Sequence, residues 1–294
     1  MKKSLYYKDA RTAYIFITPM VIIIVMLVAY PVIKAFSLSM LNYRIGSGSQ
    51  GFIGLNNYIK LLSDIMFKRA FTNTLIWTFG SVIFKLILGI ILALVLNQKF
   101  IGSQFARILV LVPWIIPTPI SGLVWTWILN DMGGVLNYIL QMVHLIKTPV
   151  AWLGISKLAL LSVIGVNIWR GTPFFAINLL AGLKSIPKSH YEAAEVDGAN
   201  RFQKFLYITL PGLKYVIIIC ILLESIWAMG DFSIVHIMTR GGPAGATHLI
   251  STYTYEIGFL SGDLGRAIAI SLFPLPILAF LIIALTKLID KENA

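Results

Sequence analysis

Three apolar stretches of this sequence each carry an aromatic residue and a polar or charged residue four positions apart. These pairs are Trp114 with Thr118, Arg170 with Phe174, and Trp227 with Asp231. Residues at this spacing lie on one face of a helix. Aromatic rings can cover the apolar face of a sugar-like ring while polar groups bind its hydroxyls, so a site for such a solute needs both kinds. Together with Gly171, which follows Arg170, these residues form the candidate solute site.

Charged residues inside apolar segments need partners, because a lone charge is costly there. We expect Arg170 and Asp231 to pair with each other across a cavity. Two other interpretations stay open: Arg170 meets an acidic group of the solute, or the aromatic rings are packing and the charges form a structural ion pair. Lys85 either faces a partner or snorkels to the surface. Glu224, three residues before Trp227, has no assigned role.

The sequence contains no recognisable catalytic machinery. It has no G-x-x-x-x-G-K-[ST] sequence for ATP phosphates, no G-x-S-x-G nucleophile turn, and no His or Cys cluster at metal-ligand spacing. The single cysteine, Cys220, lies in an apolar run and is expected to be buried. We therefore expect that this chain is not an enzyme and holds no metal or cofactor. Any energy from ATP must come from another subunit.

The composition is that of an integral membrane protein. Of the 294 residues, 58% are hydrophobic and 12% are charged, and the mean hydropathy is +0.84. The net charge of +12 comes from Lys and Arg scattered through loops, which fits membrane orientation better than nucleic-acid binding. We expect an all-α polytopic fold with one domain over residues 1–294 and a core at about 70–287. Its six predicted spans lie at about 12–33, 73–96, 108–129, 158–183, 213–238 and 266–287.

Prolines and loops give these spans further detail. Pro113, Pro117 and Pro119 should break or bend the third span, as in the discontinuous helices around transporter sites, although a packing kink is the alternative. The segment RIGSGSQG at residues 44–51 predicts a flexible turn, and residues 52–64 predict an amphipathic segment on the outer face. The basic N-terminus precedes a retained first span, with a signal peptide as the competing interpretation.

A charged segment at residues 189–211 interrupts the apolar chain and must face water. Ser189 and Glu192 have the S-x-x-E spacing of a capping box, which begins a short helix. Gly198 then permits the left-handed conformation that ends a helix. A second short helix at about 200–207 is expected to end at Pro211. This helix–glycine–helix elbow suits the close approach of a partner; a solvated connector between two spans is the alternative.

The elbow also carries an ordered motif. Residues 191–200 are YEAAEVDGAN, and residues 208–211 are ITLP. This pattern resembles the EAA loop of ABC-importer permeases, in the form found in carbohydrate importers of the maltose and multiple-sugar type. The resemblance runs from residue 52 to about 259 and includes TRGGPAGAT and STYTYEIGF. These two motifs favour the first of the two permeases that such systems encode.

The resemblance implies a type I, maltose-transporter-like fold and a permease subunit that moves a carbohydrate, expected to be an oligosaccharide, into the cytoplasm. In that family the EAA loop fits a cleft on the ATPase subunit. Its coupling residues here are Tyr191, Glu192, Ala193, Ala194, Asp197, Gly198 and Ala199. The sugar-contacting stretches of maltose-type relatives correspond to Trp114 and Thr118, to Arg170, Gly171 and Phe174, and to Trp227 and Asp231.

The implied assembly contains a second permease subunit, two cytoplasmic ATPase subunits that bind ATP and Mg²⁺, and an extracytoplasmic binding protein that delivers the solute. The resemblance implies a multi-pass protein of the bacterial cell membrane, and loop charges favour both termini in the cytoplasm. The main alternative is an importer permease for glycerol phosphate or another anionic solute. A further alternative is an ion-coupled secondary transporter that uses Glu224 and Asp231.

Overall fold

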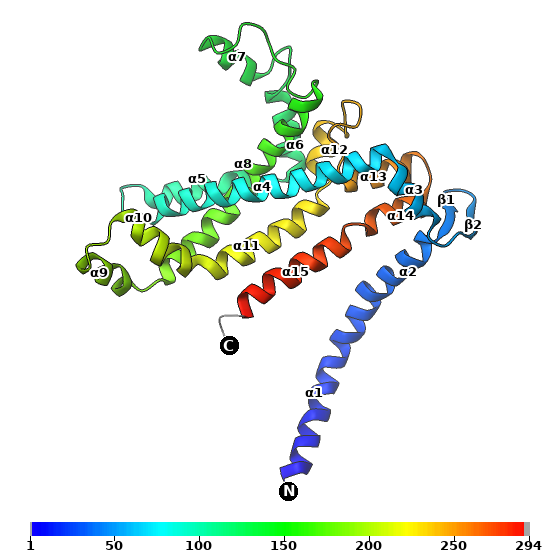
Figure 1. Ribbon diagram of the computed structural model, residues 1–294, viewed down its shortest axis with the longest axis horizontal. Coiled ribbons are helices and arrows are strands. Elements are labelled where there is room, and N and C mark those ends of the chain that lie inside the picture. Colours follow the sequence, from blue (N-terminus) through cyan, green and yellow to red (C-terminus); the bar gives the residue numbers. More distant parts are fainter. Residues whose placement is uncertain (1, 291–294) are drawn as a thin grey trace. The chain divides into compact units, whose positions relative to one another are not determined.

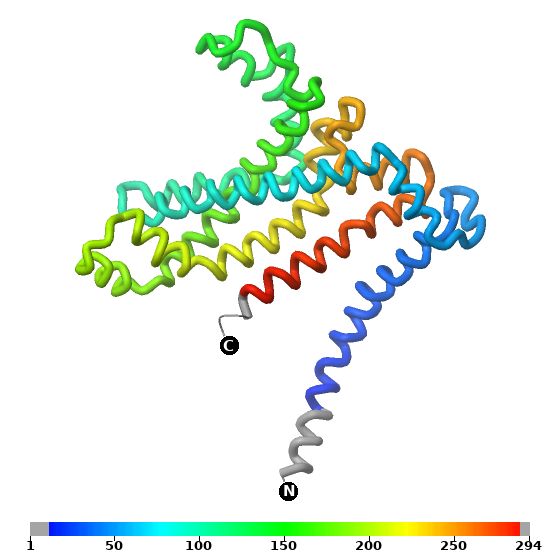
Figure 2. Tube along the Cα trace, viewed as in Figure 1, coloured from blue at the N-terminus to red at the C-terminus, as the bar shows by residue number. Residues whose placement is uncertain are grey.

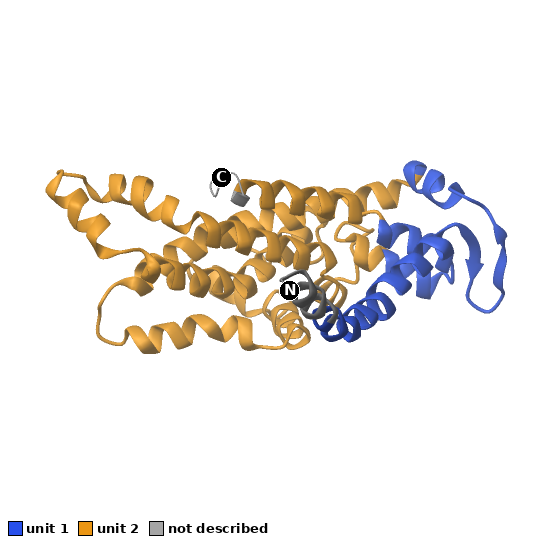
Figure 3. Cartoon of the chain, turned by 90° about the horizontal axis from the view of Figure 1, so that it is seen from below, with its two compact units in different colours: residues 1–63, 254–272 blue, residues 64–253, 273–294 orange. Residues whose placement is uncertain are grey.

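The computed structural model describes residues 2–290. Within them lie five helices long and apolar enough to cross a membrane, and a sixth when one sharply bent pair counts as a single span. The predicted all-α polytopic fold is therefore confirmed. Contacts divide the chain into two compact units, which Figure 3 distinguishes by colour. The smaller unit comprises residues 1–63 and 254–272, and the larger comprises residues 64–253 and 273–294.

The smaller unit begins with the first span, residues 12–39, which is longer than predicted and leaves its most apolar stretch unburied. The elements of this unit are α1 (Lys2–Ile24), the π-helix η1 (Val25–Ala29), α2 (Tyr30–Ser39), β1 (Leu41–Arg44), β2 (Gly48–Phe52), α3 (Asn56–Ser63), the π-helix η3 (Glu256–Leu260) and α14 (Leu264–Leu272). Only residues 45–47 of the segment predicted as a flexible turn form a turn, and residues 48–51 belong to β2 of an antiparallel hairpin in which Tyr43 pairs with Ser49. Asn57 of α3 fastens this hairpin by donating to the carbonyls of Ser39 and Leu41, at 2.8 and 3.1 Å.

The larger unit contains the second to fifth spans, and Figure 1 shows α4, α8 and α11 running side by side. The last span, Leu264–Leu288, begins with α14 in the smaller unit and continues into the larger one. Its elements are α4 (Ile65–Asn97), α5 (Ser103–Ile115), α6 (Thr118–Ile128), α7 (Val135–Met142), α8 (Ser156–Ser185), α9 (Lys188–Val196), α10 (Arg201–Lys204), the π-helix η2 (Phe205–Thr209), α11 (Leu210–Gly230), α12 (Ser233–Met238), α13 (Ile250–Tyr255) and α15 (Leu275–Asp290). The last two residues of α13 belong to the smaller unit.

Small residues bring α4 and α8 into close contact. A Cβ placed on Gly89 of α4 would lie only 2.4 Å from the Cβ of Phe175 on α8, so this contact requires glycine. Phe175 and Leu179 are fully buried beside it. In membranes, such close approach supplies the van der Waals packing that holds helices together. Cys220 of α11 is buried in the same cluster, as predicted.

The third span is broken, as its prolines predict. Helices α5 and α6 meet at 92° across Ile116 and Pro117. Ile116 has an extended backbone (ψ 127°), the conformation that a following proline imposes. Pro119 lies in the first turn of α6, where its missing N–H costs no hydrogen bond. The break therefore follows from the positions of two prolines, while Pro113 stays within α5.

The fifth span corrects two predictions. It runs over Arg201–Gly230 rather than 213–238, and Pro211 does not end a helix. The π-helical turn η2 ends at Thr209, two residues before Pro211, and such turns, like prolines, interrupt the regular hydrogen-bond ladder of a helix. The span ends early because Asp231 takes an extended conformation (ψ 127°), and a separate short helix, α12, follows.

Candidate functional site

A cavity of about 590 Å³ lies where the break between α5 and α6 faces α8 and the end of α11. It collects side chains from all three stretches that the sequence marked. Six of the seven predicted solute-site residues line it: Trp114, Thr118, Arg170, Gly171, Trp227 and Asp231. Three spans therefore converge on one chamber of a size suited to small organic ligands.

Phe174, the seventh predicted residue, connects the aromatic rings of this cavity. Its ring centroid lies 5.1 Å from that of Trp227 in an edge-on arrangement and 6.5 Å from that of Trp114. Trp114 and Trp227 are each about half exposed, at 49% and 50%. Rings fixed against one another while still accessible can receive the apolar face of a solute without large rearrangement.

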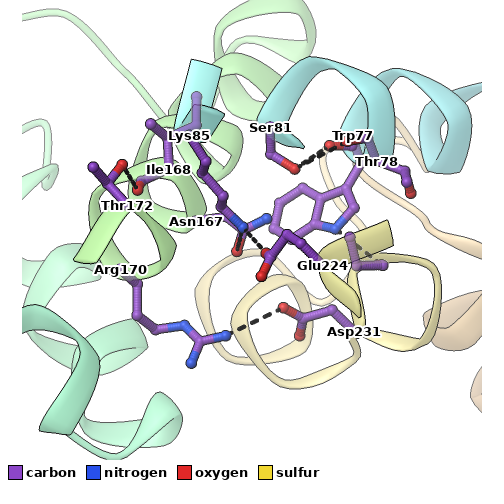
Figure 4. A network of polar contacts seen from close by, with 11 residues as sticks. Trp77, Thr78, Ser81, Lys85, Asn167, Ile168, Arg170, Thr172, Glu224 and Asp231 are labelled. Carbon is purple, nitrogen blue, oxygen red and sulfur yellow. Dashed lines mark hydrogen bonds and ion pairs between the residues drawn. The ribbon is translucent and has the colours of Figure 1, made fainter. Parts of the chain in front are cut away.

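The predicted pairing of Arg170 with Asp231 is confirmed. A guanidinium nitrogen of Arg170 lies 3.9 Å from a carboxylate oxygen of Asp231, and Figure 4 shows the two side chains reaching toward each other from α8 and the end of α11. Both side chains are mostly buried, at 24% and 12% exposure. The pair supplies charge-assisted hydrogen-bonding groups at the cavity wall.

Lys85 faces a partner and does not snorkel. It lies on α4 with no solvent exposure, and its ammonium group is in direct contact with a carboxylate oxygen of Glu224 on α11. The same ammonium donates to Oδ1 of Asn167 on α8 at 3.0 Å (Figure 4). Glu224 and Asn167 both line the cavity. One lysine thus joins three helices directly behind the candidate solute site.

The elbow begins differently from the prediction. Helix α9 starts at Lys188 and follows Pro187, so Ser189 lies inside the first turn and makes no capping hydrogen bond. The predicted capping box is wrong, and a real one lies further on. Asn200 accepts from the N–H of Gln203 at 2.9 Å, and the Gln203 side chain accepts from the N–H of Asn200 at 2.8 Å. This box begins α10.

The bend of the elbow is at Gly198, as predicted. Its φ of +76° is in the left-handed region, where most residues are strained. The N–H groups of Gly198 and Ala199 donate to carbonyls of α9 at 3.1 and 2.8 Å and close the helix end. Across the bend, Lys204 contacts Glu195 at 2.5 Å, and the hydrogen bond and charge of this ammonium lower the pKa of the Glu195 carboxyl.

The predicted coupling residues form an exposed surface on this elbow. Ala193, Ala194 and Asp197 line a surface cavity of about 610 Å³ with residues at the start of α11, and Tyr191 and Glu192 line a neighbouring one of about 460 Å³. Gly198 and Ala199 form the bend beside them. Tyr191 also bonds Thr209 at 2.9 Å, which ties α9 to the fifth span. Figure 2 shows this elbow at the far end of α8 from the α7 loop.

Metal binding has no support in the described part of the chain. Among the side chains that the structure describes, over residues 12–288, no group of three His, Cys, Asp or Glu comes together in a way that could hold a metal ion.

Comparison with known proteins establishes the family. Residues 85–292 match the family described as "Binding-protein-dependent transport system inner membrane component", which covers the cavity and the elbow. The chain belongs to this family. It is therefore a permease subunit of an ABC importer, as the EAA resemblance predicted.

Curated relatives align with this permease over nearly its whole length. It is 37% identical over 287 residues to the trehalose/maltose transport system permease protein MalF of Thermococcus litoralis, covering 97% of this chain and 96% of the relative. It is 33% identical over 270 residues to the sulfoquinovosyl glycerol transport system permease protein SmoG of Agrobacterium fabrum, covering 91% and 87%.

Solved structures share the fold. A bacterial ABC transporter involved in the import of the acidic polysaccharide alginate matches with a TM-score of 0.79 at 24% identity, covering 100% of both chains. The MetNI methionine ABC transporter matches with a TM-score of 0.53 at 18% identity, covering 80% of this permease and 98% of that chain. At these identities the likeness concerns the fold alone.

Sequence reasoning missed the role of Asn167 and left Lys85 and Glu224 unassigned. The positions of Lys85 and Glu224 inside apolar spans were signals that each needs a partner. Which partner each finds depends on packing between spans, because the two residues lie 139 positions apart. Asn167 has a weaker signal, as an amide three residues before Arg170 within an otherwise apolar stretch.

The close passage of Lys85 past α8 generates a stability prediction. A Cβ on Gly171 would lie 2.5 Å from Cε and 2.7 Å from Nζ of Lys85, so Gly171→Ala should displace the ammonium group. We expect a loss of about 1–3 kcal/mol, the usual cost of overpacking. Thermal unfolding of the detergent-purified permease measures it. Gly165→Ala on the same helix, where a Cβ meets nothing within 4 Å, is the matched control; equal unfolding temperatures of the two variants would contradict the prediction.

Proposed function

We propose that this permease moves a carbohydrate, specifically an oligosaccharide, from an extracytoplasmic binding protein into the cytoplasm. A second permease subunit completes the pathway, and two partner ATPase subunits hydrolyse ATP and hold its Mg²⁺. The single observation that carries this proposal is the cavity in which the rings of Trp114 and Trp227, both packed against Phe174, stand beside hydrogen-bonding groups. Rings bind the apolar faces of a sugar, and polar groups bind its hydroxyls.

The relatives support a sugar as the solute class. The Thermococcus litoralis relative is named for trehalose and maltose, and the Agrobacterium fabrum relative for sulfoquinovosyl glycerol. A neighbour of the same fold imports alginate. In this permease the contacts to the solute are assigned to Trp114, Thr118, Arg170, Gly171, Phe174, Trp227 and Asp231.

An anionic solute, such as glycerol phosphate, is the second candidate. The observation that favours it is Arg170, which lines the cavity and is 24% exposed there. A guanidinium binds phosphate or carboxylate in a two-pronged geometry that a lysine cannot match. The alginate transporter, whose cargo is described as an acidic polysaccharide, shows that this fold carries acidic solutes as well.

The elbow is assigned to coupling with the ATPase subunits. Its surface is exposed and includes apolar side chains, with Val196 at 88% and Phe202 at 70% exposure, which suits contact with another protein. Its stiffness comes from the Asn200 capping box, the Lys204–Glu195 ion pair and the tie from Tyr191 to Thr209. A stiff elbow can transmit a rigid-body displacement from the ATPases to α8 and α11, which reach the cavity.

This scheme implies alternating access. Closure of the ATPases on ATP moves the elbow, and the spans around the cavity then open it to the other side of the membrane. The family is one of inner-membrane components, so this permease is a multi-pass cell-membrane protein. We place both of its termini, with the elbow, on the cytoplasmic side.

Aromatic contacts to the solute are tested by removing one ring. Trp227→Ala removes a half-exposed ring from the cavity and should raise the concentration of solute at half-maximal uptake about 10- to 100-fold, as loss of a central contact residue does. Uptake of trehalose, maltose and longer oligosaccharides into proteoliposomes that hold the whole importer measures this. Trp127→Ala, 67% exposed on α6 and outside the cavity, is the matched control. Equal uptake by both variants would remove Trp227 from the site.

Coupling is tested at the bend. Gly198→Pro cannot adopt φ +76°, because proline fixes φ near −65°, and it should abolish solute-stimulated ATP hydrolysis while the permease still inserts. Gly198→Asn should keep most of the solute-stimulated ATP hydrolysis, because asparagine tolerates the left-handed region.

Glu192→Lys should also abolish this stimulation, because it reverses an exposed charge on the docking surface. Full stimulation in Gly198→Pro or Glu192→Lys would refute the role of the elbow.

A further inference from the structure

Four charged side chains, each buried or mostly buried, form two ion pairs at the candidate solute cavity. Lys85 contacts Glu224, and Arg170 lies 3.9 Å from Asp231. Figure 4 shows the two pairs in one network between α4, α8 and α11. Two cations and two carboxylates give this group a formal charge of zero.

Lys85 is the member of this network that does not line the cavity. The charged residues among those described at the cavity wall are Arg170, Glu224 and Asp231, which alone would give the wall one excess negative charge. Lys85 reaches the back of the wall from α4, and no residue of that helix lines the cavity. Its ammonium cancels the charge of Glu224 without occupying space that a solute would use.

The route of Lys85 to this position is specific. Its side chain passes across the face of Gly171, where any Cβ would overlap its last carbons and its nitrogen. At the end of this route it also donates to Oδ1 of Asn167 at 3.0 Å, which fixes the orientation of that amide at the wall. Glu224 and Asn167, which Lys85 contacts, and Gly171, which its side chain passes, all line the cavity.

Charge balance decides which solutes such a chamber accepts. A solute charge that leaves water and finds no unpaired counter-charge has a large desolvation cost, because the surroundings are of low dielectric constant. A neutral solute has no such cost and can still hydrogen-bond the paired groups. The balance thus favours solutes without net charge.

We propose that Lys85 is a positioning residue of the solute site, which neutralises Glu224 and thereby restricts the cavity to sugars or other polyhydroxy solutes that carry no net charge. This inference rests on the proposed function of the cavity and deepens it, because it favours a neutral sugar over the anionic alternative. In this proposal Arg170 pairs with Asp231 and does not bind an acidic group of the solute.

The experiment measures solute binding to the complete permease–ATPase complex in lipid nanodiscs, without the binding protein, so that only the cavity selects. Tryptophan fluorescence reports occupancy, since Trp114 and Trp227 line the cavity. The probes are matched neutral and anionic sugars: trehalose with trehalose 6-phosphate, and maltotriose with maltotrionate. The quantity compared is the ratio of the anionic to the neutral Kd within each pair.

The wild-type complex should bind the neutral member at least about tenfold more tightly. Glu224→Gln and Asp231→Asn each leave a cation unpaired with little change of shape, so each should lower the ratio of the anionic to the neutral Kd at least about tenfold. Lys85→Met should raise this ratio about tenfold. The double change Lys85→Met with Glu224→Gln should return the ratio to within about twofold of wild type.

Lys68→Met is the matched control, because it removes the same charge from an exposed position on the same helix and should leave the ratio unchanged. Co-purification with the ATPase verifies assembly, and if Lys85→Met fails to assemble, the two near-isosteric amide changes still decide the question. A merely structural ion pair would weaken both members equally and leave the ratio fixed, which would overturn this inference. If the wild-type complex binds the anionic sugar more tightly, the inference about Lys85 is overturned, while the proposed carbohydrate transport still stands. If no neutral sugar binds, the proposed function is overturned as well.

Discussion

A lysine ammonium group held inside a lipid-length helix is the constraint on which this structure depends. Lys85 is fully buried on α4 and can remain charged only because Glu224 of α11 and Asn167 of α8 meet it. Removing one partner of a buried ion pair typically costs about 3–5 kcal/mol, because the other charge is left without compensation. The three helices are therefore fixed in relation to one another at the same level as the cavity.

Glycines make this arrangement sterically possible. Gly89 allows the backbone of α8 to approach α4, and Gly171 leaves the passage through which Lys85 reaches its partners. The cavity and the elbow then share elements. Helix α8 has 30 residues, about 45 Å at 1.5 Å per residue, and runs from the α7 loop past the cavity to α9. A displacement of the elbow thus acts on the same rigid helix that carries Arg170 and Asn167.

Local patterns in the sequence predicted the parts of the site that depend on local geometry. Only Arg170 and Phe174 lie four positions apart within one helix, as their spacing predicts. Trp114 and Thr118 lie on either side of the break between α5 and α6, and Asp231 lies just past the end of α11, so the broken span and the early end of α11 bring these residues to the cavity. The break between α5 and α6 followed from the restriction that Pro117 places on the residue before it. The left-handed bend at Gly198 followed from the lack of a side chain.

The errors arose where a neighbouring residue or a distant helix decides the outcome. Helix α9 begins at Lys188, directly after Pro187, so Ser189 already lies inside the first turn and cannot cap the helix. The fifth span continues through the π-helical turn η2 and through Pro211, and no residue type announces such a turn. The pairing of Lys85 with Glu224 joins spans far apart in sequence, so a single sequence indicates the need for a partner but not its identity.

Coupling to the ATPase subunits requires the elbow and the α6–α7 loop to lie on opposite faces of the membrane, with the elbow on the side that holds ATP. Labelling introduced cysteines with a membrane-impermeant maleimide tests this directly, because the native Cys220 is buried. Val196→Cys and Met132→Cys replace side chains that are 88% and 93% exposed, at the elbow and in the loop. We predict that Met132→Cys is labelled on intact cells and Val196→Cys only after the membrane is opened. Labelling of Val196→Cys on intact cells would contradict the account.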